Sequence, residues 1–207
     1  MTDEVDDALR AGVAVYDAGH VHAAHDAWED AWLTLPDGDD ERLLHGLIQF
    51  VACVHHAENG NWEGVRGLAE SGRGYLADLP DAYRDVNVAT VRQYLATVAA
   101  DPEHVERVAP PPLRYEGASL EPADLDLGAA LRAAVPLAEA LGYDADAVER
   151  AVEYARDDLA AGEEGSAFVT FLLDFVRDAD HRGTVAARLT ERTARRRSRV
   201  EDVDGLF

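Results

Sequence analysis

The residues best suited to chemistry lie in the segment H-D-A-W-E-D-A-W, residues 25–32. His25, Glu29 and Trp32 follow i, i+4, i+7 spacing, so their side chains share one face of a helix. That face lies about 60° from the apolar stripe of the same segment, which draws the imidazole and the carboxylate toward the core. A buried carboxylate beside an imidazole must be hydrogen-bonded, metal-bound or neutralised, because an unpaired buried charge costs several kcal/mol.

A second polar stripe lies in the next predicted helix. Gln49, Cys53 and His56 again follow i, i+4, i+7 spacing. The turn P-D-G-D-D at residues 36–40 is short, so the two helices should be antiparallel neighbours. Cys53 lies in an apolar helix and is interpreted as a small hydrophobic residue. The side chains expected to line a pocket between the two helices are His25, Glu29, Trp32, Gln49 and His56.

Three interpretations of this set stay open. In the first, it is a buried polar network that fixes helix packing. In the second, it is a small-ligand pocket without metal, in which Glu29 orients His25 as a general base and Trp32 forms an apolar wall. In the third, His25, Glu29 and His56 bind a divalent metal ion, although a four-carboxylate set or a second Glu-x-x-His is missing. The sequence assigns no catalytic residue and no substrate.

The elements that position these residues are helices. Apolar residues recur at helical spacing along the chain, and neither strand alternation nor a short repeat is present, so the fold class is all-α. The predicted helices cover residue 2 up to Gly19, then 20–35, 40–58, 61–76, 87–100, 124–141, 144–161, 166–179 and 183–199. We expect Asn61 and Asp144 to cap the helices that follow them.

A proline-rich stretch, A-P-P-P-L-R-Y-E-G-A-S-L-E-P at residues 109–122, is typical of an extended connector. It predicts three parts: a compact bundle of about five helices at 1–108 that carries the His/Glu/Trp motif, the connector at 109–122, and a C-terminal helical region at 123–207. Within the first part, Gly64, Gly67, Gly72 and Gly74 are costly inside a helix and predict close approach of a neighbouring backbone.

The motifs resemble a known family. The pattern Y-D-A-G-x5-H-D-x2-E-x2-W, followed by G-L-I-Q-x6-H-x4-N-x2-G, is similar to that of the small helical proteins catalogued as domain of unknown function 309. The resemblance covers residues 16–76 and departs from the family at Asp26, where Glu is usual. It implies a compact helical bundle without an established activity. The matching positions are Tyr16, Gly19, His25, Glu29, Trp32, Gly46, Leu47, Ile48, Gln49, His56, Asn61 and Gly64.

The charge indicates an environment more than an activity. The 207 residues carry 41 acidic side chains against 19 basic ones, all of them Arg, for a net charge of −22. In roughly molar salt the Debye length falls to about 3 Å, which removes most of the self-repulsion. The composition therefore resembles proteins of salt-loving archaea, and it disfavours nucleic acid and anionic membranes as partners. An acidic N-terminus, no long apolar run and a single cysteine predict a cytoplasmic protein.

One segment is basic, in contrast to the rest of the chain. Residues 182–199 contain seven Arg and one Glu. In one interpretation this helix docks an acidic partner or RNA, which would make the chain a non-enzymatic interaction protein whose His/Glu set is structural. In the other, the arginines suit a helix C-terminus and lie against the acidic surface of the same chain. The sequence leaves self-association into homo-oligomers open.

Overall fold

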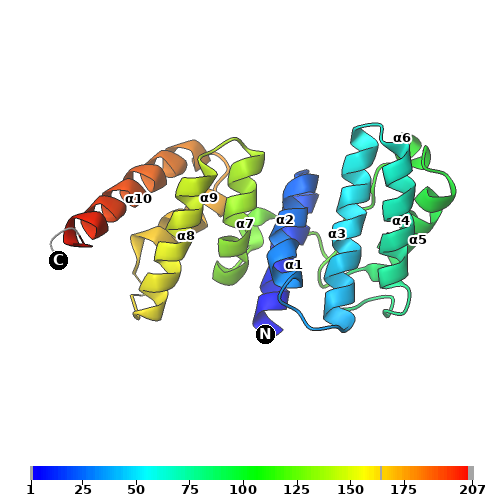
Figure 1. Ribbon diagram of the computed structural model, residues 1–207, viewed down its shortest axis with the longest axis horizontal. Helices are drawn as coiled ribbons and strands as arrows, with labels where there is room; N and C mark the ends of the chain where they lie inside the picture. Colours follow the sequence, from blue (N-terminus) through cyan, green and yellow to red (C-terminus); the bar gives the residue numbers. More distant parts are fainter. Residues whose placement is uncertain (1, 164, 205–207) are drawn as a thin grey trace. The chain divides into compact units, whose positions relative to one another are not determined.

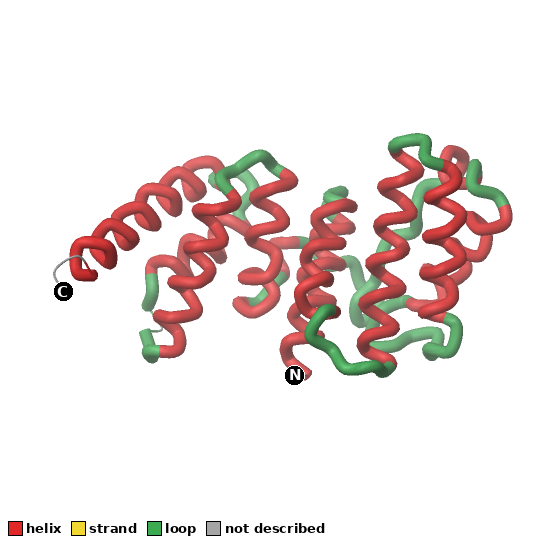
Figure 2. Tube along the Cα trace, viewed as in Figure 1, coloured by secondary structure: helices red, strands yellow, loops and turns green. Residues whose placement is uncertain are grey.

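In the computed structural model the chain forms two compact units, Met1–Glu121 and Pro122–Phe207, each built from helices joined by turns (Figures 1 and 2). The structure describes residues 2–163 and 165–204. Within these residues, no helix combines the length and hydropathy required to cross a bilayer.

The predicted all-α class is confirmed. The described residues form ten α-helices and one 3₁₀ helix, and their only β pairing consists of isolated bridges. The helices of the first unit are α1 Thr2–Asp17, α2 Val21–Trp32, α3 Asp39–Glu58, α4 Trp62–Leu76, α5 Val88–Ala100 and α6 His104–Arg107. Those of the second are η1 Pro122–Asp124, α7 Leu127–Ala140, α8 Ala145–Ala160, α9 Ala167–Arg177 and α10 Arg182–Asp204. The two short helices, α6 and η1, were absent from the sequence prediction because neither is long enough to show a period.

Side-chain caps set where several helices begin. The predicted cap at Asn61 is confirmed, since its Oδ1 accepts a hydrogen bond from the Gly64 amide at 3.1 Å. The predicted cap at Asp144 is also confirmed, with its Oδ1 accepting from the Ala147 amide at 3.0 Å. Each cap satisfies an amide that has no partner inside the first turn of its helix.

Glycines let the helices of the first unit pack closely. A Cβ at Gly12 on α1 would overlap the indole of Trp28, and one at Gly46 on α3 would overlap the side chain of Leu76 on α4. Trp28 and Leu76 are both fully buried. Helices that follow one another in the sequence are also neighbours in space, as the pairs α1–α2, α2–α3, α3–α4 and α4–α5 show (Figure 1).

The prediction of close approach at the α4 glycines is half right. A Cβ at Gly64 would overlap His56, and one at Gly72 would lie 3.0 Å from Gln49 Cβ. Around Gly67 and Gly74, however, no heavy atom of a neighbouring element lies within 4 Å of the Cβ position. These two residues point away from α3, because the contact face of a helix recurs every 3.6 residues.

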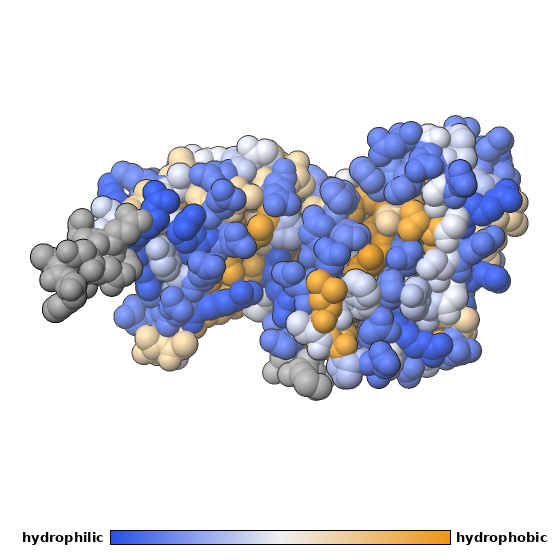
Figure 3. All heavy atoms as spheres, in the orientation of Figure 1, coloured by the Kyte–Doolittle hydropathy of each residue, from blue (hydrophilic) through white to orange (hydrophobic). Residues whose placement is uncertain are grey.

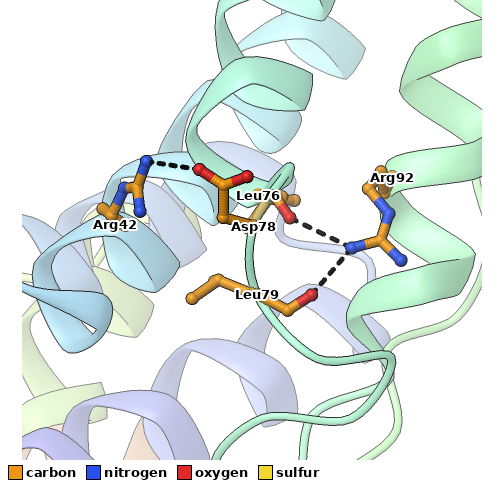
Figure 4. Close-up of polar contacts among 5 residues, drawn as sticks. All are labelled: Arg42, Leu76, Asp78, Leu79 and Arg92. Atoms are coloured by element: carbon orange, nitrogen blue, oxygen red, sulfur yellow. Dashed lines mark hydrogen bonds and ion pairs between the residues drawn. The ribbon is translucent and has the colours of Figure 1, made fainter.

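Two arginines hold the end of α4 in place, as Figure 4 shows. Arg92 of α5 donates from Nη1 to the carbonyl oxygens of Leu76 at 3.1 Å and Leu79 at 2.9 Å. Arg42 of α3 pairs with Asp78 at 3.1 Å. Carbonyls at a helix C-terminus have no partner within the helix, so a cation is stabilising there.

The proline-rich stretch that follows α6 packs against α1 within the first unit. Tyr16 donates its hydroxyl to the Pro111 carbonyl at 3.0 Å, and the Leu113 amide donates to Asp17 Oδ1 at 3.0 Å. Leu113 is fully buried. The first unit therefore draws part of its core from the proline-rich stretch.

The second unit is a separate group of helices, α7 to α10. Its largest buried side chains include Phe175 on α9 and Leu137 on α7. Helix α10 contributes Val185 and Leu189 to the same core, so it is an integral helix of the unit. On the face seen in Figure 3 hydrophilic side chains dominate, and apolar ones form smaller patches.

We predict opposite effects on stability for two Gly→Ala substitutions in α4 and α3 of the first unit. Gly67→Ala should raise the free energy of unfolding by about 0.5–1 kcal/mol, because alanine lowers the entropic cost of helix formation and meets no neighbour. Gly46→Ala should lower it by about 1–3 kcal/mol, because the buried Leu76 must shift. Urea unfolding in molar KCl measures both. Equal stability of the two variants would contradict close packing at Gly46.

Candidate functional site

The centre of the candidate site is a half-buried group on α2. His25 Nδ1 lies 2.9 Å from Asp26 Oδ1 and 4.0 Å from Glu29 Oε2. The exposed fractions of the three side chains are 24% for His25, 32% for Asp26 and 44% for Glu29. The structure thus brings the predicted pair His25 and Glu29 together and adds Asp26, the position at which this chain departs from the family pattern.

The local charge favours the imidazolium form of His25. Its pKa is raised above the ordinary value of 6.5, chiefly by the hydrogen bond with Asp26. Partial burial opposes this shift, and the negative charges of Asp26 and Glu29 add to it. His25 is therefore a group whose charge depends on its two carboxylate neighbours.

The same three residues have the geometry of a metal-binding group. One ligand atom from each of His25, Asp26 and Glu29 can be chosen so that all lie within 4.8 Å of one another. No other such group of three is found among the residues that the structure describes, and His56 is not part of this one.

His56 instead belongs to the corner between α3 and α4. Its Nδ1 accepts a hydrogen bond from Asn61 Nδ2 at 2.9 Å. The same Asn61 caps α4 through the Gly64 amide, and a Cβ at Gly64 would overlap the His56 ring. The motif H-x4-N-x2-G therefore closes this corner, which gives His56, Asn61 and Gly64 a structural role.

Trp32 contacts residues that sequence reasoning missed. Its Nε1 donates to Glu41 Oε1 at 2.7 Å, and its ring centroid lies 4.4 Å from that of His45. His45 in turn stacks on Tyr75 of α4 at 3.8 Å, and its Nδ1 lies 3.3 Å from Glu41 Oε1. These side chains link α2, α3 and α4. The i, i+4 spacing of Glu41 and His45 was the signal that could have revealed them.

Two further histidines extend the α2 group toward α3. The His22 ring lies 6.0 Å from the His25 ring and stacks on His55 at 5.1 Å with an interplanar angle of 18°. His55 Nδ1 lies 3.8 Å from Glu58 Oε2. The His22 ring therefore contacts His25 on its own helix and His55 on α3, a pairing across helices that spacing along one helix gave no reason to expect.

The packing of α3 against α4 determines where Gln49 and Cys53 lie. A Cβ at Gly72 would lie 3.0 Å from Gln49 Cβ, and in the described part of the chain no hydrogen bond is recorded for the Gln49 amide. Cys53 is fully buried, its Sγ lies 3.5 Å from the Val65 carbonyl oxygen, and burial raises the pKa of its thiol to about 12. Cys53 is thus protonated at neutral pH and unsuited to nucleophilic chemistry.

A surface cavity of about 480 Å³ adjoins the Trp32 contacts rather than His25. Glu41 and Tyr75 form part of its wall. Its remaining lining residues are Asp37, Gly38, Arg42, Glu70, Ser71 and Gly74. The five residues predicted to share one pocket are therefore distributed over four places: the α2 group, the Glu41–Tyr75 contacts, the α3–α4 corner and, for Gln49, the contact with Gly72.

Comparison with known proteins agrees with the resemblance seen in the motifs. Residues 9–68 match the family described as a domain of unknown function, DUF309. A relative from Aquifex aeolicus (strain VF5), described as an uncharacterized protein, is 24% identical over 107 residues, which are 52% of this chain. The match spans about a third, 31%, of that relative's length. The family match contains the whole α2 group and the α3–α4 corner, and neither description carries an activity.

We predict that Asp26→Asn lowers the pKa of His25 toward 6.5, because the largest cause of its elevation is removed. A histidine whose pKa is raised on folding stabilises the protein below pH 6.5, and this contribution is lost as the pH rises through the raised pKa. The variant should therefore lose more stability at pH 6 than at pH 9. NMR titration of the His25 ring protons and urea unfolding at both pH values measure the two effects.

Asp30→Asn provides the matched control, because Asp30 is an exposed acid on the same helix and lies outside the group. It should leave the titration of His25 nearly unchanged. A His25 pKa at or below 6.5 in the unsubstituted protein would contradict the assigned pairing.

Proposed function

We propose that the first unit binds a divalent transition-metal ion through His25, Asp26 and Glu29. The observation that carries the proposal is the convergence of one imidazole and two carboxylates within 4.8 Å. Two ligand atoms that each lie about 2.0–2.2 Å from one ion are about 3–3.6 Å apart. The distances from His25 Nδ1 to the two carboxylates, 2.9 and 4.0 Å, bracket that spacing.

The exposure of the group favours an ion over a purely structural network. Fully buried polar groups need protein partners, but side chains that retain 24–44% exposure remain accessible to water or to an ion. Helical spacing brings His25, Asp26 and Glu29 together, and their partial exposure leaves ligand atoms open to an ion. Water would occupy the remaining coordination positions, and such open positions are typical of metal sites that polarise a small substrate.

The ligand types narrow the choice of ion. One imidazole and two carboxylates suit Zn²⁺, Mn²⁺ or Fe²⁺, whereas Ca²⁺ and Mg²⁺ prefer oxygen alone. His22 neighbours His25 and stacks on His55, so the two rings could orient His25 from outside the ligand set. The carboxylates offset the charge of the ion, and the neutral imidazole that an ion requires forms only above the raised pKa of His25.

We predict that the chelator-treated protein binds about one equivalent of Zn²⁺, Mn²⁺ or Co²⁺ at pH 8 in molar KCl. Glu29→Gln and Asp26→Asn should each weaken binding at least tenfold, in line with the loss of a charged ligand. Affinity should fall as the pH is lowered through the raised pKa of His25, since the proton and the ion compete. Isothermal titration calorimetry and the absorption spectrum of the Co²⁺ complex measure these effects.

Asp30→Asn again serves as the control, since it removes the same charge from the same helix outside the group. Far-UV circular dichroism of every variant checks that α2 remains folded. Absence of saturable binding for all three ions, or equal weakening by Asp30→Asn and Glu29→Gln, would overturn the proposal.

We also propose that the protein works in concentrated salt in the cytoplasm, supported by its net charge of −22. Raising KCl from 0.1 to about 2 M should raise Tm at pH 7, because the ions screen repulsion among the carboxylates. The increase should be smaller at pH 4.5, near the isoelectric point, where the net charge is close to zero. A Tm that is independent of KCl at pH 7 would contradict this adaptation.

A further inference from the structure

A stripe of arginines on α10 lines a cavity in the second unit. Arg192, Arg195, Arg196 and Arg199 follow i, i+3, i+4, i+7 spacing and so share one face of the helix. They form one wall of a cavity of about 500 Å³. The opposite wall comes from the end of α8, the following turn and the start of α9, with the residues Asp158, Glu163, Gly165, Ser166, Ala167 and Phe168.

One of these arginines is fixed within the wall. Arg196 Nη1 donates to Asp158 Oδ1 at 2.6 Å, and its guanidinium lies 4.3 Å from the centroid of the Tyr154 ring. Asp158 is only 8% exposed and also accepts from Ser166 Oγ at 2.5 Å. Burial raises the pKa of Asp158, but the hydrogen bonds from Ser166 and Arg196 outweigh it and lower that pKa. Asp158 therefore stays ionised, and its charge is balanced inside the wall.

The other three arginines are exposed around this fixed group. Arg192 lies over the Phe168 ring at 5.6 Å, and Arg195 pairs with Glu191 of the same helix while remaining 67% exposed. An exposed pair of this kind contributes little and exchanges readily with another anion. Among the described residues of the lining, arginines outnumber carboxylates four to two, in a chain that is otherwise strongly acidic.

We propose that this cavity binds a small molecule through a phosphate group. Guanidinium groups donate in a planar fork that matches the oxygens of a phosphate, and a fixed Arg196 lowers the entropic cost of assembling the set. A volume of about 500 Å³ lies in the range of small-ligand pockets. A long nucleic acid is disfavoured, because the rest of the chain repels a polyanion that extends beyond the cavity.

Titration with inorganic phosphate and pyrophosphate in molar KCl tests the site, because chloride then competes away non-specific binding. We expect saturable binding of both probes, with Arg195→Gln and Arg199→Gln each weakening it at least fivefold. Arg196→Gln is not used, since it would also leave Asp158 without its partner. Arg188→Gln is the control, because Arg188 is an exposed arginine on the same helix that does not line the cavity.

Three results would overturn the proposal: no saturable binding of either probe, equal weakening by Arg188→Gln, or tighter binding of an RNA oligonucleotide that depends steeply on salt. Thermal unfolding of each variant checks that the second unit remains intact. The titrations are made with chelator present and repeated with Glu29→Gln. Binding that persists there separates this site from the metal site proposed for the first unit.

Discussion

Close packing of α3 against its neighbours is the constraint on which the first unit depends. Gly46 admits the buried Leu76 from α4, and Gly72 admits the stem of Gln49 from α3, so each helix of this pair supplies a glycine where the other supplies a side chain. Interiors are packed at near-crystalline density, which leaves little freedom for one helix to rotate about its axis. The faces that α2, α3 and α4 present to solvent follow from this packing.

The family motif divides into two parts with different physical roles. His56, Asn61 and Gly64 form the α3–α4 corner, where the Asn61 side chain bonds both to the His56 ring and to the Gly64 backbone amide. His25 and Glu29 lie on a half-buried face of α2, where i, i+4 spacing brings them together. The corner residues bond to one another and cap α4, whereas His25, Asp26 and Glu29 retain exposed fractions of 24–44%, which leaves the α2 group the better candidate for binding an ion.

Periodicity predicted the helices because apolar spacing and caps are local properties of the sequence. Asn61 and Asp144 act as predicted, since a cap needs only its own first turn. The candidate site was harder to predict, because side chains meet according to the rotation of each helix about its axis. His56 is hydrogen-bonded to Asn61, which places its ring beside the start of α4. Tyr75 stacks on His45 from α4, a helix from which the sequence predicted no site residue.

The two proposed sites are built from side chains of opposite charge, and both would act on a ligand by direct contact. At His25 two carboxylates lie beside an imidazole, and at Arg196 several guanidinium groups surround a carboxylate. In molar salt the Debye length is about 3 Å, so distant charges act weakly and only groups in direct contact with a ligand retain their effect. Selective binding in such a medium must come from clustered ligand atoms and hydrogen-bond geometry. On these proposals, the net charge of −22 suits the chain to concentrated salt, and the local clusters select what it binds.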